Sequence, residues 1–295
     1  MVNAQLVTNA QNRLDKEMDL QLTNKIAVVT GGTRGIGRAI SETLVAEGAH
    51  VVVASRTQAS VNETIDTLGP SVSGVVADVT KPNDLRRIAD AVLERHGGCD
   101  ILINNAGTGT YKPFLDVTDE DLQYGMAINF FAQFRLSQLL VPSMMQRAGG
   151  VIVNISGRTA IRTAHPPGST CTGPAKAAEL RFTADLAEEL KPHGIRVVCI
   201  VPGVVMTPDR FAKWEREATG RDLTAGEAGE LRRELERDKL PPGATWGTPQ
   251  QIADITTFVA SPRASYLSGE SILVDGSPGS YSYVRALYES SPRPS

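Results

Sequence analysis

The sequence of 295 residues has only three cysteines, a formal net charge of −3 and no apolar run long enough to span a bilayer. The cysteines are too few and too irregularly spaced for a disulfide framework or a zinc site, so they suit a reducing compartment and no metal site is predicted. The near balance of 30 basic and 33 acidic side chains gives no electrostatic reason to expect nucleic acid or a membrane surface as a partner. The first twenty residues also lack a signal-peptide core. We therefore expect a soluble cytoplasmic protein whose partner is a small molecule.

The sequence does contain a regular alternation of short apolar runs and longer amphipathic stretches. The runs are nearly unbroken, which is typical of strands buried on both faces of a parallel sheet. They cover residues 26–30, 50–54, 74–77, 100–104, 151–155, 195–201 and 271–274. The helical candidates between them cover residues 36–47, 57–68, 83–96, 119–147, 174–190 and 249–260. This repetition predicts an α/β fold with a doubly wound, seven-stranded parallel sheet flanked by helices.

Three segments fall outside this repeating pattern. Residues 1–18 are polar and aperiodic, and we predict a flexible N-terminal arm ahead of one domain over 19–280. Residues 208–245 are rich in charge and follow the sixth strand. They are either a solvated insertion or a substrate lid, and their position beyond the carboxyl end of a strand favours the lid. The tail at 281–295 is either frayed or packed on a partner subunit.

A glycine-rich turn joins the first strand to the first helix, and residues 30–37 read TGGTRGIG. Gly31 allows a tight turn, Gly35 lets a pyrophosphate approach the backbone, and Gly37 lets the helix pack close to the strand. The N-terminus of the helix then offers free N–H donors and a favourable dipole to the phosphates. A turn without a ligand is the alternative, but the strand–turn–helix context favours a dinucleotide.

The glycine spacing resembles that of the short-chain dehydrogenase/reductase superfamily, and further motifs agree over about residues 19–277. The overall likeness is greatest to 3-oxoacyl-carrier-protein reductases. The resemblance implies a single Rossmann-type domain that binds a nicotinamide dinucleotide. The contacts it implies are Gly31, Thr33, Arg34, Gly35, Ile36 and Gly37 in the glycine loop, Asp78 and Val79 near the adenine, Asn105, Ala106 and Gly107 after the fourth strand, Lys176 at the ribose, and Pro202, Gly203 and Thr207 near the nicotinamide.

The end of the second strand indicates which nicotinamide is bound. An acidic residue there would hydrogen-bond the ribose hydroxyls of NAD, but the chain has Ser55 and Arg56 instead. Arg34 in the glycine loop faces the same region in members of the superfamily. Two guanidinium groups can pair with a 2′-phosphate, which a carboxylate would repel. We predict NADP(H), although Arg56 on its own could be a solvated residue at a helix start.

The resemblance also implies a catalytic set of Asn, Ser, Tyr and Lys, and this chain departs from it. Asn129, Ser156 and Lys176 match three members of the set, but Thr172 stands four residues before Lys176, where the family pattern has tyrosine. No tyrosine occurs between residues 125 and 265, so a shifted register cannot restore the phenol. An aliphatic hydroxyl is far less acidic than a phenol and reaches less far, so Thr172 is a poor general acid.

The missing phenol leaves three readings open. The chain is a reductase of a carbonyl or an activated double bond that uses another proton donor, namely a water held by Thr172 and Lys176, or Ser156, His165 or Tyr111. Alternatively, it performs isomerisation, elimination or cyclisation on the same fold, or it is a non-catalytic binder of NADP(H). The intact glycine loop, Arg34, Arg56, Asn105 and Lys176 indicate that cofactor binding survives, which argues against a further alternative, a pure scaffold partner; the reductase is the leading prediction.

Each matched residue also has an ordinary structural explanation. Lys176 could be a surface lysine, Ser156 a capping hydroxyl, and Asn129 a buried side chain that stabilises a helix kink. Cys171 could line the pocket, but nothing near it suggests a lowered thiol pKa. The resemblance further implies assembly through the helices at 119–147 and 174–190, so we predict a homotetramer, or otherwise a homodimer.

Overall fold

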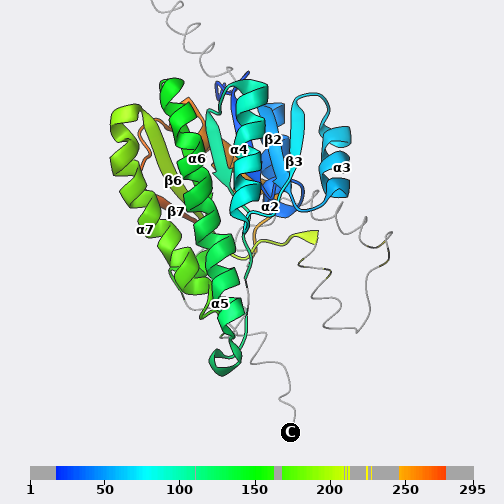
Figure 1. The fold of residues 1–295 in the computed structure, drawn as a ribbon, viewed down its shortest axis with the longest axis vertical. Helices are drawn as coiled ribbons and strands as arrows, with labels where there is room; N and C mark the ends of the chain where they lie inside the picture. The colour runs from blue at the N-terminus through cyan, green and yellow to red at the C-terminus, as the bar shows by residue number, and fades with distance from the viewer. Residues whose placement is uncertain are drawn as a thin grey trace, which may run out of the picture.

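A computed structural model of the chain contains the predicted seven-stranded parallel sheet (Figure 1). It describes residues 18–109, 111–162, 168–208 and 246–276, with residues 210, 212, 224 and 227 between the last two ranges. The strand order is β3-β2-β1-β4-β5-β6-β7, and it reverses between β1 and β4. A crevice at the carboxyl ends of the strands is expected at such a reversal. The strands are β1 (Ile26–Thr30), β2 (His50–Ser55), β3 (Val72–Val76), β4 (Ile101–Asn104), β5 (Gly150–Ile155), β6 (Ile195–Pro202) and β7 (Ser271–Val274).

Helices cover both faces of the sheet, and Figure 1 shows one of these layers in front of the strands. One face carries α2 (Gly35–Ala46), α3 (Gln58–Leu68) and α10 (Pro249–Ala260). The other face carries α4 (Pro82–His96), α5 (Asp119–Met126), α6 (Ala132–Gln146) and α7 (Thr172–Leu190). The helix predicted over 119–147 is not uniform, because the π-helical segment η2 (Ala127–Phe131) separates α5 from α6. Short 3₁₀ turns complete the described elements at η1 (Phe114–Asp116), η3 (Arg158–Ala160), η4 (Lys191–His193) and η5 (Pro262–Ala264).

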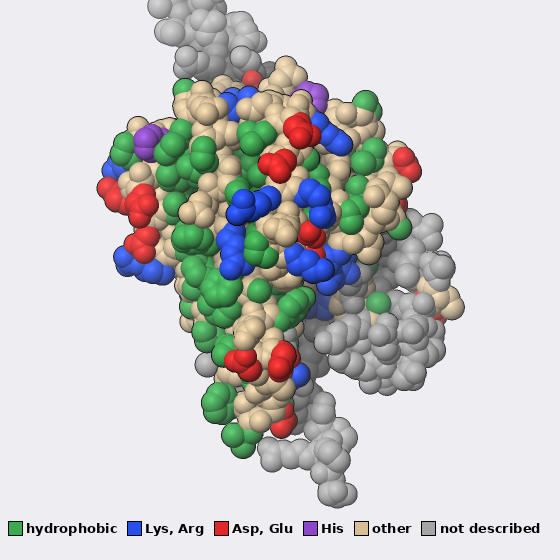
Figure 2. Space-filling view, in the orientation of Figure 1, with side chains coloured by type: hydrophobic (Ala, Val, Ile, Leu, Met, Phe, Trp, Pro, Cys, Tyr) green, Lys and Arg blue, Asp and Glu red, His purple; other side chains and the backbone are tan. Residues whose placement is uncertain are grey.

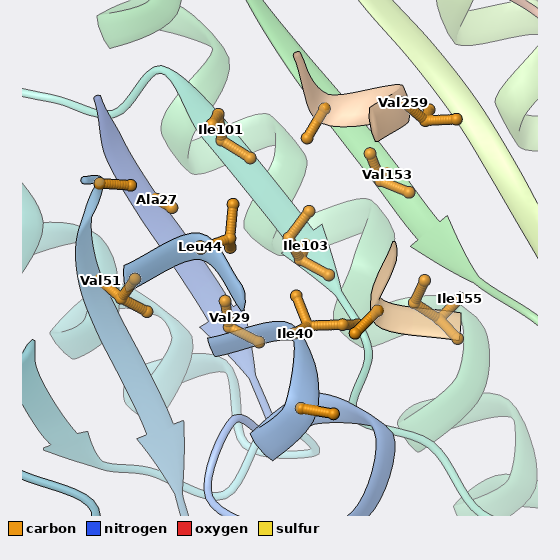
Figure 3. Packing of buried hydrophobic residues seen from close by; sticks show 14 of the residues in the cluster. Ala27, Val29, Ile40, Leu44, Val51, Ile101, Ile103, Val153, Ile155 and Val259 are labelled. Carbon is orange, nitrogen blue, oxygen red and sulfur yellow. The ribbon is translucent and has the colours of Figure 1, made fainter. Parts of the chain in front are cut away.

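The alternation of side chains along the strands divides the core between the two faces. Ala27 and Val29 of β1 join the cluster that packs against α2 and α10, as Figure 3 shows for Ile40 and Leu44 of α2. Val28, between them, belongs to the cluster that packs against α4 and α6 on the opposite face. Because both faces are covered, most strand positions are apolar and few alternate with polar residues, which explains the nearly unbroken runs in the sequence.

Local sequence sets several helix ends. Thr118 begins α5 with a capping box, in which its side chain accepts from the Asp121 amide and the Asp121 side chain accepts from the Thr118 amide. Thr248 and Gln251 form the same arrangement at the start of α10. Gly97 ends α4 in the left-handed conformation that favours glycine. The caps at Thr118 and Thr248 fix helix starts at the carboxyl edge of the sheet, and Gly97 ends α4 ahead of β4 at the opposite edge.

The predicted arm, insertion and tail fall almost entirely outside the described residues, as does His165. Among the residues that the structure does describe, none of the helices combines the length and the apolar character that crossing a membrane requires.

Candidate active site

The glycine loop between β1 and α2 has a backbone conformation that leaves no room for side chains at two of its glycines and favours glycine at Gly31 and Gly35. Gly31 and Gly35 have φ of +63° and +54°, in the left-handed region that favours glycine. A Cβ atom on Gly37 would lie 2.1 Å from the carbonyl oxygen of Gly31, so only glycine fits there. The loop and the first turn of α2, which contains Ile36, thus form a cradle that fits the pyrophosphate of a dinucleotide.

Asn105 braces this cradle from the end of β4. Its side-chain Nδ2 donates to the carbonyl oxygens of Thr30 at 2.9 Å and of Gly31 at 3.3 Å. The hydroxyl of Thr30 accepts from the backbone amides of Asn105 and Ala106, each at 3.0 Å. The predicted cofactor residues Asn105 and Ala106 therefore have a structural task, because they hold the carboxyl ends of β1 and β4 together at the reversal of strand order.

The end of β2 is linked to the glycine loop through hydroxyl groups. Thr33 Oγ1 donates to Ser55 Oγ at 2.9 Å, and Ser55 Oγ lies 3.0 Å from Ser60 Oγ. Arg34 and Arg56, the chain neighbours of Thr33 and Ser55, are both exposed. Two guanidinium groups thus belong to the loop and to the strand end where a ribose would lie, and neither residue 55 nor residue 56 supplies a carboxylate.

Asp78 and Val79 follow β3 at the same edge of the sheet. The Asp78 carboxylate accepts from the amide of Thr80 at 3.0 Å and from its hydroxyl at 2.7 Å. The amide of Asp78 donates to Asp84 Oδ2 at 2.8 Å, and this bond is the main cause that lowers the pKa of Asp84. The Val79 side chain is buried in the core beneath the edge. The carboxylate of Asp78 thus orders its own turn.

The segment after β6 lies against the glycine loop. A Cβ atom on Gly35 would lie 3.2 Å from the methyl carbon of Thr207. Pro202 ends β6, and the amide of Gly203 donates to the carbonyl oxygen of Val274 at 2.9 Å. The structure therefore brings the predicted residues Pro202, Gly203 and Thr207 to the edge of the sheet that carries the loop.

Asn129 lies in the π-helical segment η2, and both polar atoms of its side-chain amide form hydrogen bonds. Its Nδ2 donates to the carbonyl oxygen of Gly125 at 2.9 Å, and its Oδ1 accepts from the amide of Thr108 at 3.1 Å. A Cβ atom on Gly107 would lie 2.9 Å from Asn129 Oδ1 and 3.5 Å from Lys176 Nζ. Gly107 therefore leaves room for the amide oxygen and the ammonium group to approach the same position, so Asn129 shapes the helix and also faces the predicted site.

Ser156 and Lys176 are held against each other. Ser156 directly follows β5, and its Oγ donates to the backbone carbonyl oxygen of Lys176 at 3.1 Å. The side chain of Lys176 passes close to Gly157, where an added Cβ would lie 3.3 Å from Lys176 Cδ. Thr172 is the first residue of α7 and is buried. Residues four apart on a helix share a face, so Thr172 and Lys176 lie on the same side of α7.

Comparison with known proteins places this arrangement in a family. Residues 25–218 match the family model described as short chain dehydrogenase. The chain belongs to this family. Dehydrogenase/reductase SDR family member 4 of Mus musculus is 38% identical over 262 residues, which cover 86% of this chain and 87% of that protein. The 3-oxoacyl-[acyl-carrier-protein] reductase of Vibrio cholerae is 31% identical over 257 residues, which cover 87% and 98%.

Solved structures of the family have the same architecture. L-sorbose reductase from Gluconobacter frateurii, complexed with NADPH and L-sorbose, matches with a TM-score of 0.77 and 33% identity, over 88% of this chain and 98% of that chain. A 7α-hydroxysteroid dehydrogenase complexed with NADH and a 7-oxo bile acid matches with a TM-score of 0.74 and 32% identity, over 88% and 95%. The predicted superfamily, fold and enzyme class are confirmed, and the chain is a short-chain family oxidoreductase with relatives that use nicotinamide cofactors.

Two polar residues near Lys176 were not predicted from the sequence. Glu179 of α7 and Gln133 of α6 are 0% and 2% exposed, and both belong to the layer that covers the sheet. A signal for Glu179 was present, because it is an acidic residue three positions after Lys176, on the helix face that packs inward. Gln133 has no comparable signal in the sequence, because only packing decides which side of α6 meets α7.

Proposed function

We propose that the chain is an NADP(H)-dependent reductase that acts on a carbonyl group or an activated double bond of a small organic molecule. The observation that carries this proposal is the convergence of Lys176 Nζ, Asn129 Oδ1 and Gly107 beside the reversal of strand order. In an open α/β sheet, this is the place where a dinucleotide and its substrate meet. The cradle of Gly31, Gly35 and Gly37 supplies the adjoining phosphate site.

The preference for NADP(H) follows from the two exposed arginines. Arg34 and Arg56 flank the hydroxyl pair of Thr33 and Ser55, so a 2′-phosphate would meet two cations and two hydroxyl groups. Solved relatives carry NADPH in one case and NADH in another, so the family alone does not set the preference.

A bound nicotinamide would supply the hydride, and the residues of the chain would handle the proton. The Ser156 hydroxyl must turn from the Lys176 carbonyl oxygen, 3.1 Å away, before it can donate to a substrate oxygen. The Thr172 hydroxyl is too weak an acid to give up a proton on its own at neutral pH, but it can pass one on while it receives another, and it can hold a water beside Lys176. We infer that this water, or the Thr172 hydroxyl in series with Lys176, delivers the proton.

A titration with NADPH, followed by nicotinamide fluorescence and compared with NADH, tests the cofactor. We expect tight binding of NADPH and weaker binding of NADH. Oxidation of NADPH with a panel of activated ketones and enones then tests the reaction. Failure to bind either nucleotide would refute the reductase.

Non-redox chemistry is the second candidate, and Thr172 is the observation that favours it. Without a phenol, Lys176 and Ser156 could still stabilise an oxyanion in an isomerisation or elimination. Tight NADPH binding with no NADPH oxidation over the whole panel would favour this candidate.

We also propose that the chain forms a homotetramer, or otherwise a homodimer, through the face made by α5, α6 and α7. Hydrophobic side chains gather over these helices in Figure 2. Phe130, Phe131, Phe134 and Phe182 form a cluster of rings, with the centroids of Phe134 and Phe182 5.2 Å apart. Phe131 and Phe134 remain 38% and 44% exposed, which is the kind of surface that a partner subunit covers. Light scattering that finds a monomer at micromolar concentration would refute this assembly.

A further inference from the structure

A carboxyl group is buried directly behind the lysine of the site. Glu179 is 0% exposed, and its Oε1 lies 3.5 Å from Nζ of Lys176. Its other oxygen, Oε2, is buried and has no hydrogen-bond partner among the described residues. An ionised carboxylate in such a place would leave one oxygen uncompensated, whereas a neutral carboxyl group tolerates it far better.

The groups that face Glu179 come from each neighbouring element. Gln133 of α6 is buried, and neither atom of its amide has a hydrogen-bond partner among the described residues. Ser156 beyond β5 directs its hydroxyl to the Lys176 carbonyl oxygen. Cys199 of β6 has a thiol pKa raised to about 12, first by burial and then by the charge of Glu179, so it stays neutral. Lys176 therefore supplies the cationic charge that acts on Glu179.

Burial is the main cause that raises the pKa of Glu179, to about 7. The charge of Lys176 and the polar groups of Ser156 and Gln133 oppose this rise. Both protonation states of the carboxyl group are thus populated near neutral pH.

The side chains along α7 form a continuous polar line toward the site. Thr172, Lys176 and Glu179 are separated by four and three residues, so they share one face of the helix. All three are buried, although apolar side chains would normally occupy such a face. The line joins the position of the missing phenol to the buried carboxyl group.

We propose that Glu179 is a proton store for Lys176 and takes over part of the task of the missing phenol. The proposal rests on the reductase function proposed above. Glu179 does not reach the substrate, so it is a positioning and relay residue and not a catalytic one.

When the carbonyl carbon gains its new C–H bond, the π electron pair of the C=O bond moves onto oxygen. That oxygen takes a proton from the Thr172 hydroxyl or from its water, which takes one from Lys176 Nζ, which takes one from the Glu179 carboxyl. The result is an alcohol, a restored lysine ammonium and a Glu179 carboxylate paired with it. After product release, the carboxylate regains its proton from water by the same route.

Infrared spectroscopy of the full chain tests the store without any reaction. We expect the difference between the protein and Glu179→Gln to contain the C=O stretch of a neutral carboxyl group, which disappears as the pH rises through about 7. Glu188→Gln is the matched control, because it removes an 82% exposed carboxylate from the same helix. It should produce no such band. Absence of the band from the Glu179→Gln difference below neutral pH would overturn the proposal.

The pH profile of NADPH oxidation separates a relay from a purely structural role. In Glu179→Gln we expect kcat to fall at least about tenfold, with little change in KM for NADPH, and the limb of the kcat profile near neutral pH to disappear. Glu179→Asp, which keeps a carboxyl group, should retain the limb and recover part of kcat. An unchanged profile in Glu179→Gln would overturn the store but leave the reductase standing.

If no substrate is reduced, the proposed function fails. The infrared titration then still shows whether the carboxyl group of Glu179 is neutral below about pH 7. If Glu179→Gln does not fold, the infrared test is made with Glu179→Asp instead. That variant must then show a neutral carboxyl band displaced from the band of Glu179, and an unmoved band would assign it to another residue.

Discussion

The glycine loop and the start of α7 lie at the same edge of one sheet but follow the family pattern to different degrees. The loop keeps each glycine that its backbone requires, and hydroxyl groups and Asn105 brace it. The start of α7 has Thr172 in place of the expected tyrosine and a buried Glu179 behind Lys176. The glycine loop follows β1 and the start of α7 follows β5, so one segment can depart from the family pattern while the other keeps it.

Thr172→Tyr should have the largest effect, because it would restore a phenol beside Lys176. A positioned general acid contributes about 100-fold to 10,000-fold in rate, so we expect kcat for an ordinary ketone to rise by about 100-fold or more. Steady-state kinetics with NADPH measures it. Thr172→Phe supplies the ring without the hydroxyl group, and equal activity of the two variants would mean that the pocket geometry has diverged as well.

Glu179→Gln should change how stability depends on pH. The pKa of Glu179 is raised from 4.5 to about 7 in the folded chain. Below its pKa in the unfolded chain, the carboxyl group is neutral in both states and causes no loss of stability. As the pH rises from that value to the folded pKa, the unfolded chain loses the proton while the folded chain keeps it, so the free energy of unfolding falls. The wild-type chain should therefore lose roughly 3 kcal/mol of unfolding free energy, relative to Glu179→Gln, between about pH 4.5 and 7. Urea unfolding at several pH values measures the difference, and parallel curves would contradict it.

Gly37→Ala should damage the glycine loop, although alanine favours a helix more than glycine does. The added methyl group would lie 2.1 Å from the Gly31 carbonyl oxygen. Such overpacking costs about 1 to 3 kcal/mol, and we expect NADPH to bind about tenfold or more weakly because the cradle must shift. Gly247→Ala is the control, since among the residues that the structure describes its methyl group would meet only the side chain of Gln251, at 3.2 Å. Equal nucleotide affinity in the two variants would contradict the role of the cradle.

Arg56→Glu should have the smallest of these effects, because Arg34 remains. We expect a loss of about tenfold in NADPH affinity, corresponding to one charge-assisted contact, and no loss for NADH. Fluorescence titration with both nucleotides measures the ratio. Arg95→Glu, which makes the same charge change on the exposed face of α4, should leave the ratio unaltered.

Much of the fold was predictable because its signals are local. The strands β1 and β7 have the predicted bounds, and α10 does as well. Other ends moved by one or two residues, and β3 begins at Val72, two residues ahead of the apolar run predicted from Gly74. The π-helical break at Ala127–Phe131 was not predicted, since a sequence that favours helix does not reveal an extra residue in one turn.

The sequence by itself determined the seven-stranded parallel sheet, the glycine loop, the absence of a tyrosine near Lys176 and the presence of Arg34 and Arg56, on which the proposed preference for NADP(H) rests. Each depends on residues adjacent in the chain or on the presence of one residue type. Only the tertiary structure decided that Asn105 braces the loop, that the side chains of Asn129 and Lys176 both approach Gly107, and that Glu179 lies buried beside Gln133. These facts depend on which faces of separate elements meet, and that is set by packing around the whole core.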